Sequence, residues 1–295
     1  MYLPSFQYVA PKDTGELAAL LADHGDDARI LSGGTDLLVQ LKNSGVKLDY
    51  VIDISGLDEL SGISHDDKTG LVIGSAAKLD DIMEMPEVKE KYFALWQSIE
   101  TIGARQIRTM GSLGGNICNA SPAADTPPAL VAFNAEVTIA NGDKERNMPL
   151  VDFIQGNRKT ALKKGEYLKS ISVPSPKKKS GSAYHHFRVR GGMEIAMVAA
   201  AVAVELEADN ETIKDAVIAL GVVAPAPINA EDAAQKLIGQ KPSEDLLQKV
   251  SQACADISKP IDDFRASAEY RKEILRVLVE EAFDEAYAQV AGESK

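Results

Sequence analysis

The 295-residue sequence predicts a protein of the α+β class that is built from two domains. In the first part of the chain, strand patterns alternate with helix patterns, as they do in α/β units. From residue 183 onward, three strand patterns come first and three helix patterns follow. Between the two parts lies Pro174-Ser-Pro-Lys-Lys-Lys-Ser-Gly-Ser182, where proline, glycine and serine occur together as they do in linkers.

The composition excludes several classes of function. With 45% hydrophobic and 26% charged residues, the chain resembles an ordinary globular protein. Its net charge of −12 argues against nucleic-acid binding, which needs a basic face. Two cysteines, Cys118 and Cys254, are too few for a disulfide framework or an all-cysteine iron–sulfur site. No signal peptide pattern opens the sequence, and the longest apolar run, Ile195–Val204, is too short for a membrane span. We therefore expect a cytoplasmic protein.

The first α/β unit is expected to begin with a helix after Asp13, because Glu16 three positions later completes a capping box. Leu17, Leu20 and Leu21 then give that helix one apolar face. The strand, helix and strand that follow are expected at Ala28–Leu31, Leu37–Leu41 and Tyr50–Ile54.

The middle of the chain combines hairpins with helices. A single helix is expected at Pro86–Ile102, and another should start with Thr126 as its N-cap. Asn141-Gly142 suits a type I′ turn between two strands. The remaining elements are a hairpin at 63–73 and a strand at 167–173, then strands at 183–190, 195–206 and 212–223 and helices at 230–238, 243–257 and 267–288.

Two glycine-rich stretches stand out against these regular elements. The first is Leu31-Ser32-Gly33-Gly34-Thr35-Asp36, and the second runs from Thr109 to Asp125 with almost no large apolar side chain. Glycines let a ligand approach the main chain closely, and successive N–H groups in such loops form anion-binding concavities. The two stretches together suggest a long phosphorylated ligand held between them.

The glycine spacing excludes two common phosphate sites. Neither Gly33-Gly34 nor Gly111 to Gly115 forms the Gly-x-Gly-x-x-Gly fingerprint of a dinucleotide fold, and no Gly-x-x-x-x-Gly-Lys loop occurs. Taken alone, Gly33-Gly34 could equally be a tight turn between a strand and a helix. Paired with the second stretch, it favours a different kind of phosphate cradle.

With both stretches considered, the chain resembles the FAD-binding medium subunits of the molybdenum hydroxylases, a family that includes xanthine and carbon monoxide dehydrogenases. The motifs that carry the resemblance occur in order along nearly the whole chain: Ser32-Gly33-Gly34-Thr35-Asp36, Gln106-Ile107-Arg108, Leu113-Gly114-Gly115-Asn116, Ala120-Ser121-Pro122 with Asp125, Arg190, Glu194-Ile195-Ala196 and Gly221–Ile228.

The resemblance implies a PCMH-type FAD-binding domain, of the vanillyl-alcohol-oxidase type, at residues 1–176. This domain would comprise two α/β subdomains, at about 1–57 and 58–176. A smaller α+β domain with a three-stranded antiparallel sheet and helices would follow at 182–290.

The resemblance also implies which residues bind FAD. Residues 29–37 would wrap the pyrophosphate through main-chain N–H groups, and the second stretch would contact the pyrophosphate and ribityl parts. The residues so implied are Arg29, Ile30, Leu31, Ser32, Gly33, Gly34, Thr35, Asp36, Leu37, Ile102, Gly103, Gly111, Ser112, Gly115, Asn116, Cys118, Asn119, Asp125, Leu168 and His186. No side chain is expected to act as an acid, base or nucleophile, and no metal ligands are expected in this chain.

Several residues in or near these motifs have an alternative interpretation. Asp125 could only start the helix that follows it, and Cys118 is expected to be a small residue beside the flavin, not a redox thiol. Arg105 and Arg108 could be surface charges, although we favour a role in neutralising the pyrophosphate. His186 stands where the family commonly has lysine, and Glu194 replaces the usual aspartate.

The resemblance implies an electron-transfer subunit of a flavin-dependent oxidoreductase. A large subunit with a molybdopterin cofactor would oxidise the substrate, and a small subunit would carry two [2Fe–2S] clusters, in a dimer of heterotrimers. Electrons would reach FAD from those clusters and pass to NAD or another acceptor. Two alternatives stay open: a self-contained flavin oxidase of the vanillyl-alcohol-oxidase type, and an assembly subunit that has lost its flavin.

Overall fold

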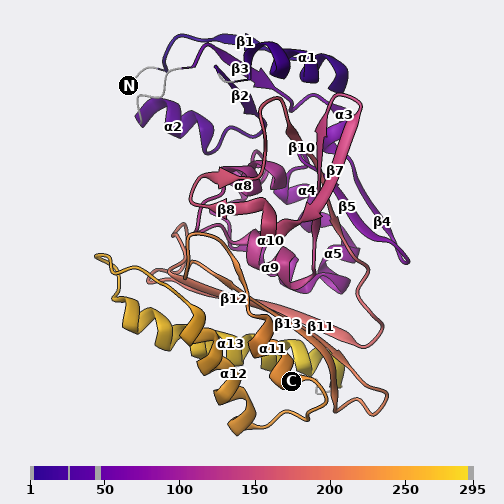
Figure 1. Ribbon diagram of the computed structural model, residues 1–295, viewed down its shortest axis with the longest axis vertical. Coiled ribbons are helices and arrows are strands. Elements are labelled where there is room, and N and C mark those ends of the chain that lie inside the picture. Colours follow the sequence, from indigo (N-terminus) through magenta and orange to yellow (C-terminus); the bar gives the residue numbers. More distant parts are fainter. Residues whose placement is uncertain (1–2, 26, 44–47, 292–295) are drawn as a thin grey trace.

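The computed structural model describes residues 3–25, 27–43 and 48–291. It arranges them as three parts stacked along the long axis of the molecule: a small N-terminal subdomain, a larger middle subdomain and a C-terminal domain (Figure 1). Among the helices in these ranges, none has the length and apolar character that a membrane span requires.

The N-terminal subdomain is a small parallel sheet. Its strands β1 (Gln7–Val9), β2 (Ala28–Leu31) and β3 (Tyr50–Asp53) lie in the order β1-β3-β2, with helices α1 (Thr14–His24) and α2 (Leu37–Asn43). The predicted N-cap of α1 is confirmed, because the Glu16 N–H donates to Asp13 Oδ1 at 2.8 Å. The Glu16 carboxylate does not complete the box at Asp13 but accepts from the Lys12 N–H at 2.8 Å. Since parallel strands end at the same edge, the first glycine-rich stretch leaves the sheet where β2 ends.

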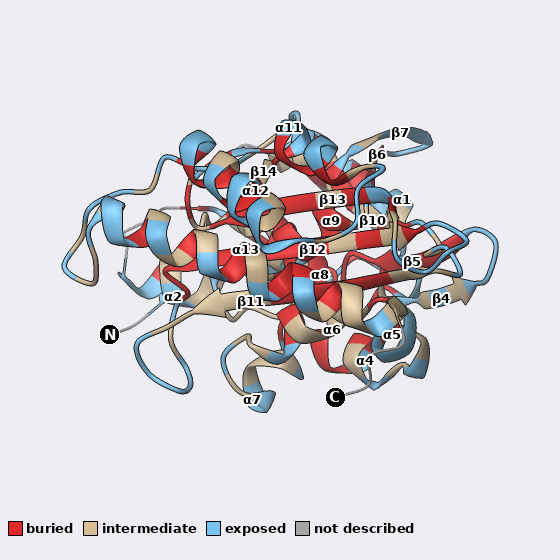
Figure 2. Cartoon of the chain, turned by 90° about the horizontal axis from the view of Figure 1, so that it is seen from below, coloured by how far each residue is buried: buried red, intermediate tan, exposed pale blue. Residues whose placement is uncertain are grey.

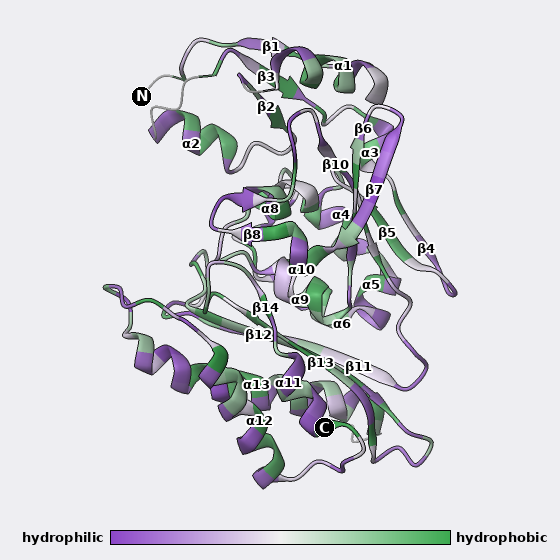
Figure 3. Ribbon diagram, in the orientation of Figure 1, coloured by the Kyte–Doolittle hydropathy of each residue, from purple (hydrophilic) through white to green (hydrophobic). Residues whose placement is uncertain are grey.

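The middle subdomain is built on an antiparallel sheet in the order β4-β5-β10-β6-β7. Its edge strand β7 is strongly hydrophilic (Figure 3), which discourages pairing with another sheet. The strands are β4 (Ile63–Asp66), β5 (Gly70–Gly74), β6 (Glu136–Asn141), β7 (Lys144–Pro149) and β10 (Tyr167–Val173), and β8 (Ile154–Gly156) and β9 (Lys159–Thr160) form a separate pair. The helices are α3 (Asp58–Ser61), α4 (Leu79–Glu84), α5 (Pro86–Lys91), α6 (Phe93–Glu100), α7 (Arg105–Arg108), α8 (Leu113–Asn119), α9 (Thr126–Ala132) and α10 (Leu150–Phe153).

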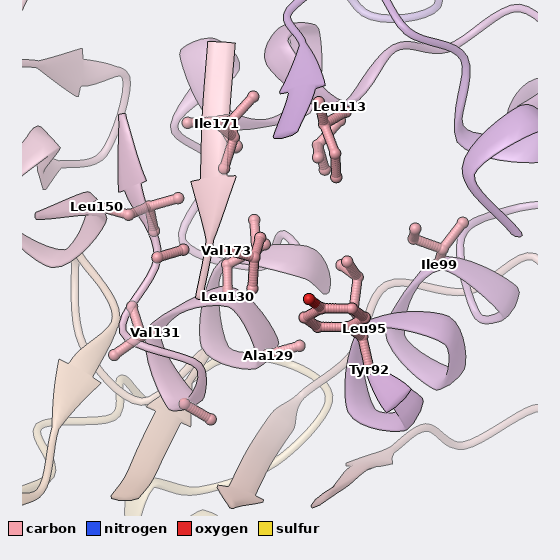
Figure 4. Packing of buried hydrophobic residues seen from close by; sticks show 14 of the residues in the cluster. Tyr92, Leu95, Ile99, Leu113, Ala129, Leu130, Val131, Leu150, Ile171 and Val173 are labelled. Atoms are coloured by element: carbon pink, nitrogen blue, oxygen red, sulfur yellow. The ribbon is translucent and has the colours of Figure 1, made fainter. Parts of the chain in front are cut away.

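The core of this subdomain lies between β10 and helices α6, α8 and α9. Figure 4 shows Tyr92, Leu95 and Ile99 opposite Leu113 and the residues of α9 and β10. All three are fully buried. This packing fixes α8, which lies within the second glycine-rich stretch, and the start of α9, which follows directly after it.

Three local predictions were wrong. The helix expected at 86–102 is two helices, because Tyr92 (φ −120°, ψ 48°) leaves the helical conformation between α5 and α6. The hairpin turns at Gly142-Asp143, since Asn141 pairs with Lys144; only Gly142 has a positive φ (58°), as in a type II′ turn and not type I′. The N-cap of α9 is Asp125, one residue before the predicted Thr126.

The C-terminal domain has four antiparallel strands where three were predicted. The strand order is β11-β12-β13-β14, and the two-residue β14 pairs with the end of β13. The strands are β11 (Ser180–Phe187), β12 (Val198–Leu206), β13 (Ile213–Gly221) and β14 (Ile228–Asn229). Helices α11 (Glu231–Ala234), α12 (Glu244–Ile257) and α13 (Ala268–Ala291) and the 3₁₀ turn Gln235–Leu237 follow, as the sequence predicted for this part.

Both faces of this sheet are covered. Along β12, Val198, Ala200 and Val202 pack into the core with the helices of the domain, whereas Ala199 and Ala201 join the core of the middle subdomain. Such alternation follows from the two-residue period of a strand. Figure 2 accordingly shows most of β12 and β13 as buried, while α12 and α13 are exposed along their outer sides. The C-terminal domain is therefore packed firmly against α9.

Candidate functional site

The two glycine-rich stretches lie against each other. A Cβ atom added to Gly33 would come within 2.0 Å of the Met110 carbonyl oxygen, so only glycine permits this contact. A Cβ atom on Gly111 would lie 3.6 Å from the Thr35 hydroxyl oxygen. Stretches about 80 residues apart thus form one continuous backbone surface.

The first stretch offers unused hydrogen-bond donors. Within the described ranges, no carbonyl or side chain accepts from the N–H groups of Gly33, Gly34, Thr35 or Asp36. The Ser32 hydroxyl is buried and likewise has no partner among the described residues. Gly34 adopts a left-handed conformation (φ 72°), which turns the backbone at this point. A buried hydroxyl rarely stays unsatisfied, and successive main-chain N–H groups form anion-binding concavities. The buried Ser32 hydroxyl and the four partly buried or exposed N–H groups therefore fit an anionic ligand such as a pyrophosphate.

The second stretch is organised differently. Its helix α8 is capped by Ser112, whose hydroxyl oxygen accepts from the Gly115 N–H at 3.1 Å. The Leu113 N–H donates to the Ala77 carbonyl at 3.1 Å, and the Gly114 N–H donates to the Ser75 carbonyl at 3.0 Å. The first-turn donors of α8 are therefore already engaged. The exposed Gly115 backbone offers close approach instead.

Two asparagines of α8 link neighbouring elements. The Thr126 hydroxyl donates to Asn116 Oδ1 at 2.7 Å, which ties α8 to the start of α9. Asn119 Oδ1 accepts from Gln40 Nε2 of α2 at 3.0 Å and also from the Arg158 guanidinium. Neither Gln40 nor Arg158 was predicted as a site residue. Asn119 thus joins the middle subdomain to the N-terminal one beside the glycine-rich surface.

Asp125 is a partly buried carboxylate at the start of α9. Its side chain does not cap that helix, which contradicts the reading of Asp125 as only a helix-start residue. Instead, Oδ1 accepts a 2.6 Å hydrogen bond from the Tyr184 hydroxyl of β11. Burial raises the pKa of Asp125 to about 6, against smaller lowering effects of Tyr184, Arg188 and Thr101. The carboxylate is thus ionised at neutral pH but close to its titration range.

Two other site residues have shifted pKa values. Burial raises the pKa of Cys118 to about 12, so its thiol is protonated, in agreement with the non-redox role expected from the sequence. Burial, with smaller effects of Arg188 and His185, lowers the pKa of His186 to about 4. His186 is therefore neutral near pH 7 and does not replace the charge of the lysine expected at this position.

The remaining predicted residues differ in accessibility. Leu168 is only 4% exposed and packs in the core of the middle subdomain, next to a bulge in β10. Ile102 packs against the same core, and Gly103 has a positive φ of 51°. Arg29 is exposed and donates to the adjacent Ala28 carbonyl at 2.8 Å. Ile30, Leu31 and Leu37 pack against the small cores of the N-terminal subdomain.

The two arginines before the second stretch are engaged within the protein. Arg105 pairs with Asp80 at 3.0 Å and with Glu84 at 2.8 Å. Arg108 donates to the carbonyls of Glu100 and Ile102 at 3.0 and 3.2 Å. These contacts show both guanidinium groups bound to acceptors of the protein itself, and they do not support the role in neutralising the pyrophosphate that the sequence suggested. Glu194 accepts from the Arg190 N–H and so closes its own loop.

Comparisons with known proteins agree with this arrangement. Residues 4–176 match the family described as the FAD binding domain in molybdopterin dehydrogenase, and residues 182–286 match the carbon monoxide dehydrogenase flavoprotein C-terminal domain. The chain is 32% identical to the glyceraldehyde dehydrogenase medium chain of Sulfolobus acidocaldarius, over 97% of this chain and 99% of that protein. It is 31% identical to a putative xanthine dehydrogenase FAD-binding subunit of Escherichia coli, over 92% and 93% of the two chains.

A solved structure shows the same fold. A chain of the carbon monoxide dehydrogenase from Hydrogenophaga pseudoflava, in a form that lacks the Mo-pyranopterin moiety of the molybdenum cofactor, superimposes with a TM-score of 0.93 at 31% identity. The match covers 98% of this chain and 100% of that one. The protein therefore belongs to the family of FAD-binding medium subunits of the molybdenum hydroxylases and is an oxidoreductase subunit.

Proposed function

We propose that this chain holds FAD on the surface formed by its two glycine-rich stretches and transfers electrons within a molybdenum hydroxylase complex. The observation that carries the proposal is the run of N–H groups from Gly33 to Asp36, which have no hydrogen-bond partner in the described part of the chain. Beside them lies the buried Ser32 hydroxyl, which also lacks a partner there. These donors would offset the charge of a pyrophosphate in a chain whose net charge is −12. When bound, the flavin supplies the redox chemistry, and the protein supplies binding, orientation and electrostatics.

The proposed contacts divide between the two stretches. Main-chain donors of the first stretch would bind the pyrophosphate, as anion-binding concavities do. In the second stretch, the open backbone at Gly115 and the side chains of Asn116, Asn119 and Asp125 would face the ribityl and ring portions. His186, which is neutral at pH 7, would contribute a hydrogen bond and not a charge. Leu168 would support the site from beneath, since it is almost completely buried.

The proposed partners are a molybdopterin-binding large subunit and a small subunit with two [2Fe–2S] clusters, in a dimer of heterotrimers. Electrons from the clusters would reach the FAD of this chain and then pass to NAD or another acceptor. Relatives with "medium chain" or "FAD-binding subunit" in their names support this assembly. Substrate specificity would then reside in another subunit. The division at residues 1–57, 58–176 and 182–290 and a cytoplasmic location belong to the same proposal.

Copurification separates this function from its alternatives. We expect the native protein to carry flavin and to bring down partner chains that contain iron and molybdenum, as measured by visible absorption, metal analysis and mass spectrometry. A chain that carries flavin alone would point to a self-contained oxidase. A chain without flavin would point to an assembly subunit and would contradict the proposal.

The flavin site itself is tested by Gly115→Val. Its Cβ would lie 2.9 Å from the Ser112 hydroxyl oxygen, and its methyl groups would cover the exposed backbone at the start of α8. We expect this variant to purify without FAD. Gly56→Val is the control, because a Cβ at Gly56 meets nothing within 4 Å. A Gly115→Val protein with a stoichiometric flavin spectrum would remove the second stretch from the site.

A further inference from the structure

We propose that Tyr184 is a positioning residue, through which the C-terminal domain orients the Asp125 carboxylate for FAD. This inference rests on the proposed function. Its geometric basis is the 2.6 Å hydrogen bond from the Tyr184 hydroxyl to Asp125 Oδ1, which joins two residues 59 positions apart in different domains. Hydrogen bonds to an ionised acceptor are short and strong, so this contact can select one orientation of the carboxylate.

Tyr184 is itself held in place from several sides. Its side chain is 3% exposed and belongs to the hydrophobic core of the middle subdomain, although its backbone lies in β11 of the C-terminal domain. The Tyr184 N–H donates to Gln97 Oε1 of α6 at 2.7 Å. Its ring stacks on that of His186 with a centroid distance of 5.8 Å. The hydroxyl is therefore presented to Asp125 by a rigid support.

The contact also reaches α8. Asp125 is followed directly by Thr126, whose hydroxyl donates to Asn116 Oδ1 at 2.7 Å. One short segment thus carries the carboxylate that Tyr184 holds and the hydroxyl that holds Asn116. Because Asp125 and Asn116 are both proposed to face FAD, loss of the tyrosine hydroxyl would loosen two ligand contacts together. Docking of the C-terminal domain, which also carries His186, would thereby complete a site whose other proposed residues lie in the N-terminal and middle subdomains.

The test is Tyr184→Phe, which removes only the hydroxyl oxygen. After removal of FAD from the isolated protein, with any subunits that copurify, FAD binding is measured by quenching of flavin fluorescence. We expect about tenfold weaker binding for Tyr184→Phe, because a hydrogen bond to a charged group is lost. Tyr92→Phe is the matched control: Tyr92 is fully buried in the same core, and its hydroxyl has no hydrogen-bond partner among the described residues.

A double-mutant cycle distinguishes positioning from general support of the fold. In an Asp125→Ala background, Tyr184→Phe should weaken FAD binding no further, because the hydroxyl acts through the carboxylate. Additive effects of the two substitutions would overturn the proposal. So would equal FAD affinity of Tyr184→Phe and Tyr92→Phe, a comparison that does not depend on the Asp125 variant. Wild-type protein that binds no FAD would contradict the proposed function instead.

Discussion

Gly33 and Met110 touch through their backbones, so closely that a single added carbon atom on Gly33 would fall 2.0 Å from the Met110 carbonyl oxygen. This contact joins the two glycine-rich stretches. It also means that Gly33 serves the assembly of the site as well as access of a ligand to it.

We predict that Gly33→Ala destabilises the protein by about 1–3 kcal/mol, the usual cost of forcing an extra carbon into a packed region. FAD should be lost as well, because the two stretches must separate. Chemical denaturation and the flavin content of the purified protein measure the two effects. Gly56→Ala, at a position with open space around it, should change neither. Full flavin content in Gly33→Ala would contradict this prediction, because it would show that FAD still binds when the two stretches are forced apart.

The cap of α8 gives a second prediction. Ser112→Ala removes the acceptor of the Gly115 N–H and should cost about 1 kcal/mol of stability. Because α8 lies in the proposed site, FAD affinity should fall too. Ser243→Ala is a matched control, since the Ser243 hydroxyl caps α12 in the same way, at 3.3 Å from the Leu246 N–H. Ser243→Ala should lose similar stability by thermal denaturation and retain its FAD affinity. Equal FAD affinities of Ser112→Ala and Ser243→Ala would show that α8 does not form part of the FAD site.

The sequence predicted most elements because local patterns specify them. Ala28–Leu31 and Tyr167–Val173 were predicted at their observed bounds. The break at Tyr92 could not be predicted, because Tyr92 fits the apolar spacing of one continuous helix. Its side chain is completely buried by tertiary packing, which the local sequence does not reveal. Strand β14 is two residues long, Ile228-Asn229, and such a short segment has no period to detect.

The site could be predicted only where it has a local motif. Both glycine-rich stretches could be recognised in the sequence, because backbone conformations and close contacts that only glycine permits require a high glycine content. Tyr184 was not, since it lies in an ordinary alternating strand and meets Asp125 only after two domains dock. The carbonyl groups of Ser75 and Ala77, which engage the first-turn donors of α8, are main-chain atoms and leave no trace in the sequence.

The buried Asp125 carboxylate predicts a pH-dependent effect of Asp125→Asn. Burial raises the pKa of Asp125 from 3.8 to about 6 in the folded protein. The protonated Asp125 carboxyl group therefore makes its full contribution to the stability of the folded protein below about pH 4, and this contribution is lost as the pH rises through 6. At pH 8 the ionised group costs about 2–3 kcal/mol. The FAD-free Asp125→Asn variant should be more stable than the wild type by up to that amount at pH 8 and equally stable at pH 4, while its FAD affinity falls.

The stabilities of these variants are measured by chemical denaturation at each pH. Asp209 provides a control in the same measurements, because its pKa is shifted in the opposite direction. Hydrogen bonds from Thr212, and then from the Glu211 N–H, lower the pKa of this exposed carboxylate to about 2. Its stabilising effect is present above about pH 4 and is lost as the pH falls through 2. Asp209→Asn should therefore be less stable than the wild type at pH 8. If Asp125→Asn is also less stable than the wild type at pH 8, burial does not destabilise the ionised Asp125 carboxylate.

Cys118 is predicted to be unreactive even though it lies in the proposed site. With a pKa of about 12, raised by burial, its thiolate fraction at pH 8 is on the order of 10⁻⁴. Alkylation by iodoacetamide at pH 8 should be at least about a hundredfold slower in the folded protein than in urea, where the thiol pKa returns to about 8.5. Burial raises the pKa of Cys254 to about 12 as well, so both cysteines should be protected, and peptide mass mapping assigns any label. Rapid labelling of Cys118 alone would reveal a thiolate beside the glycine-rich surface and would contradict a purely packing role for this residue.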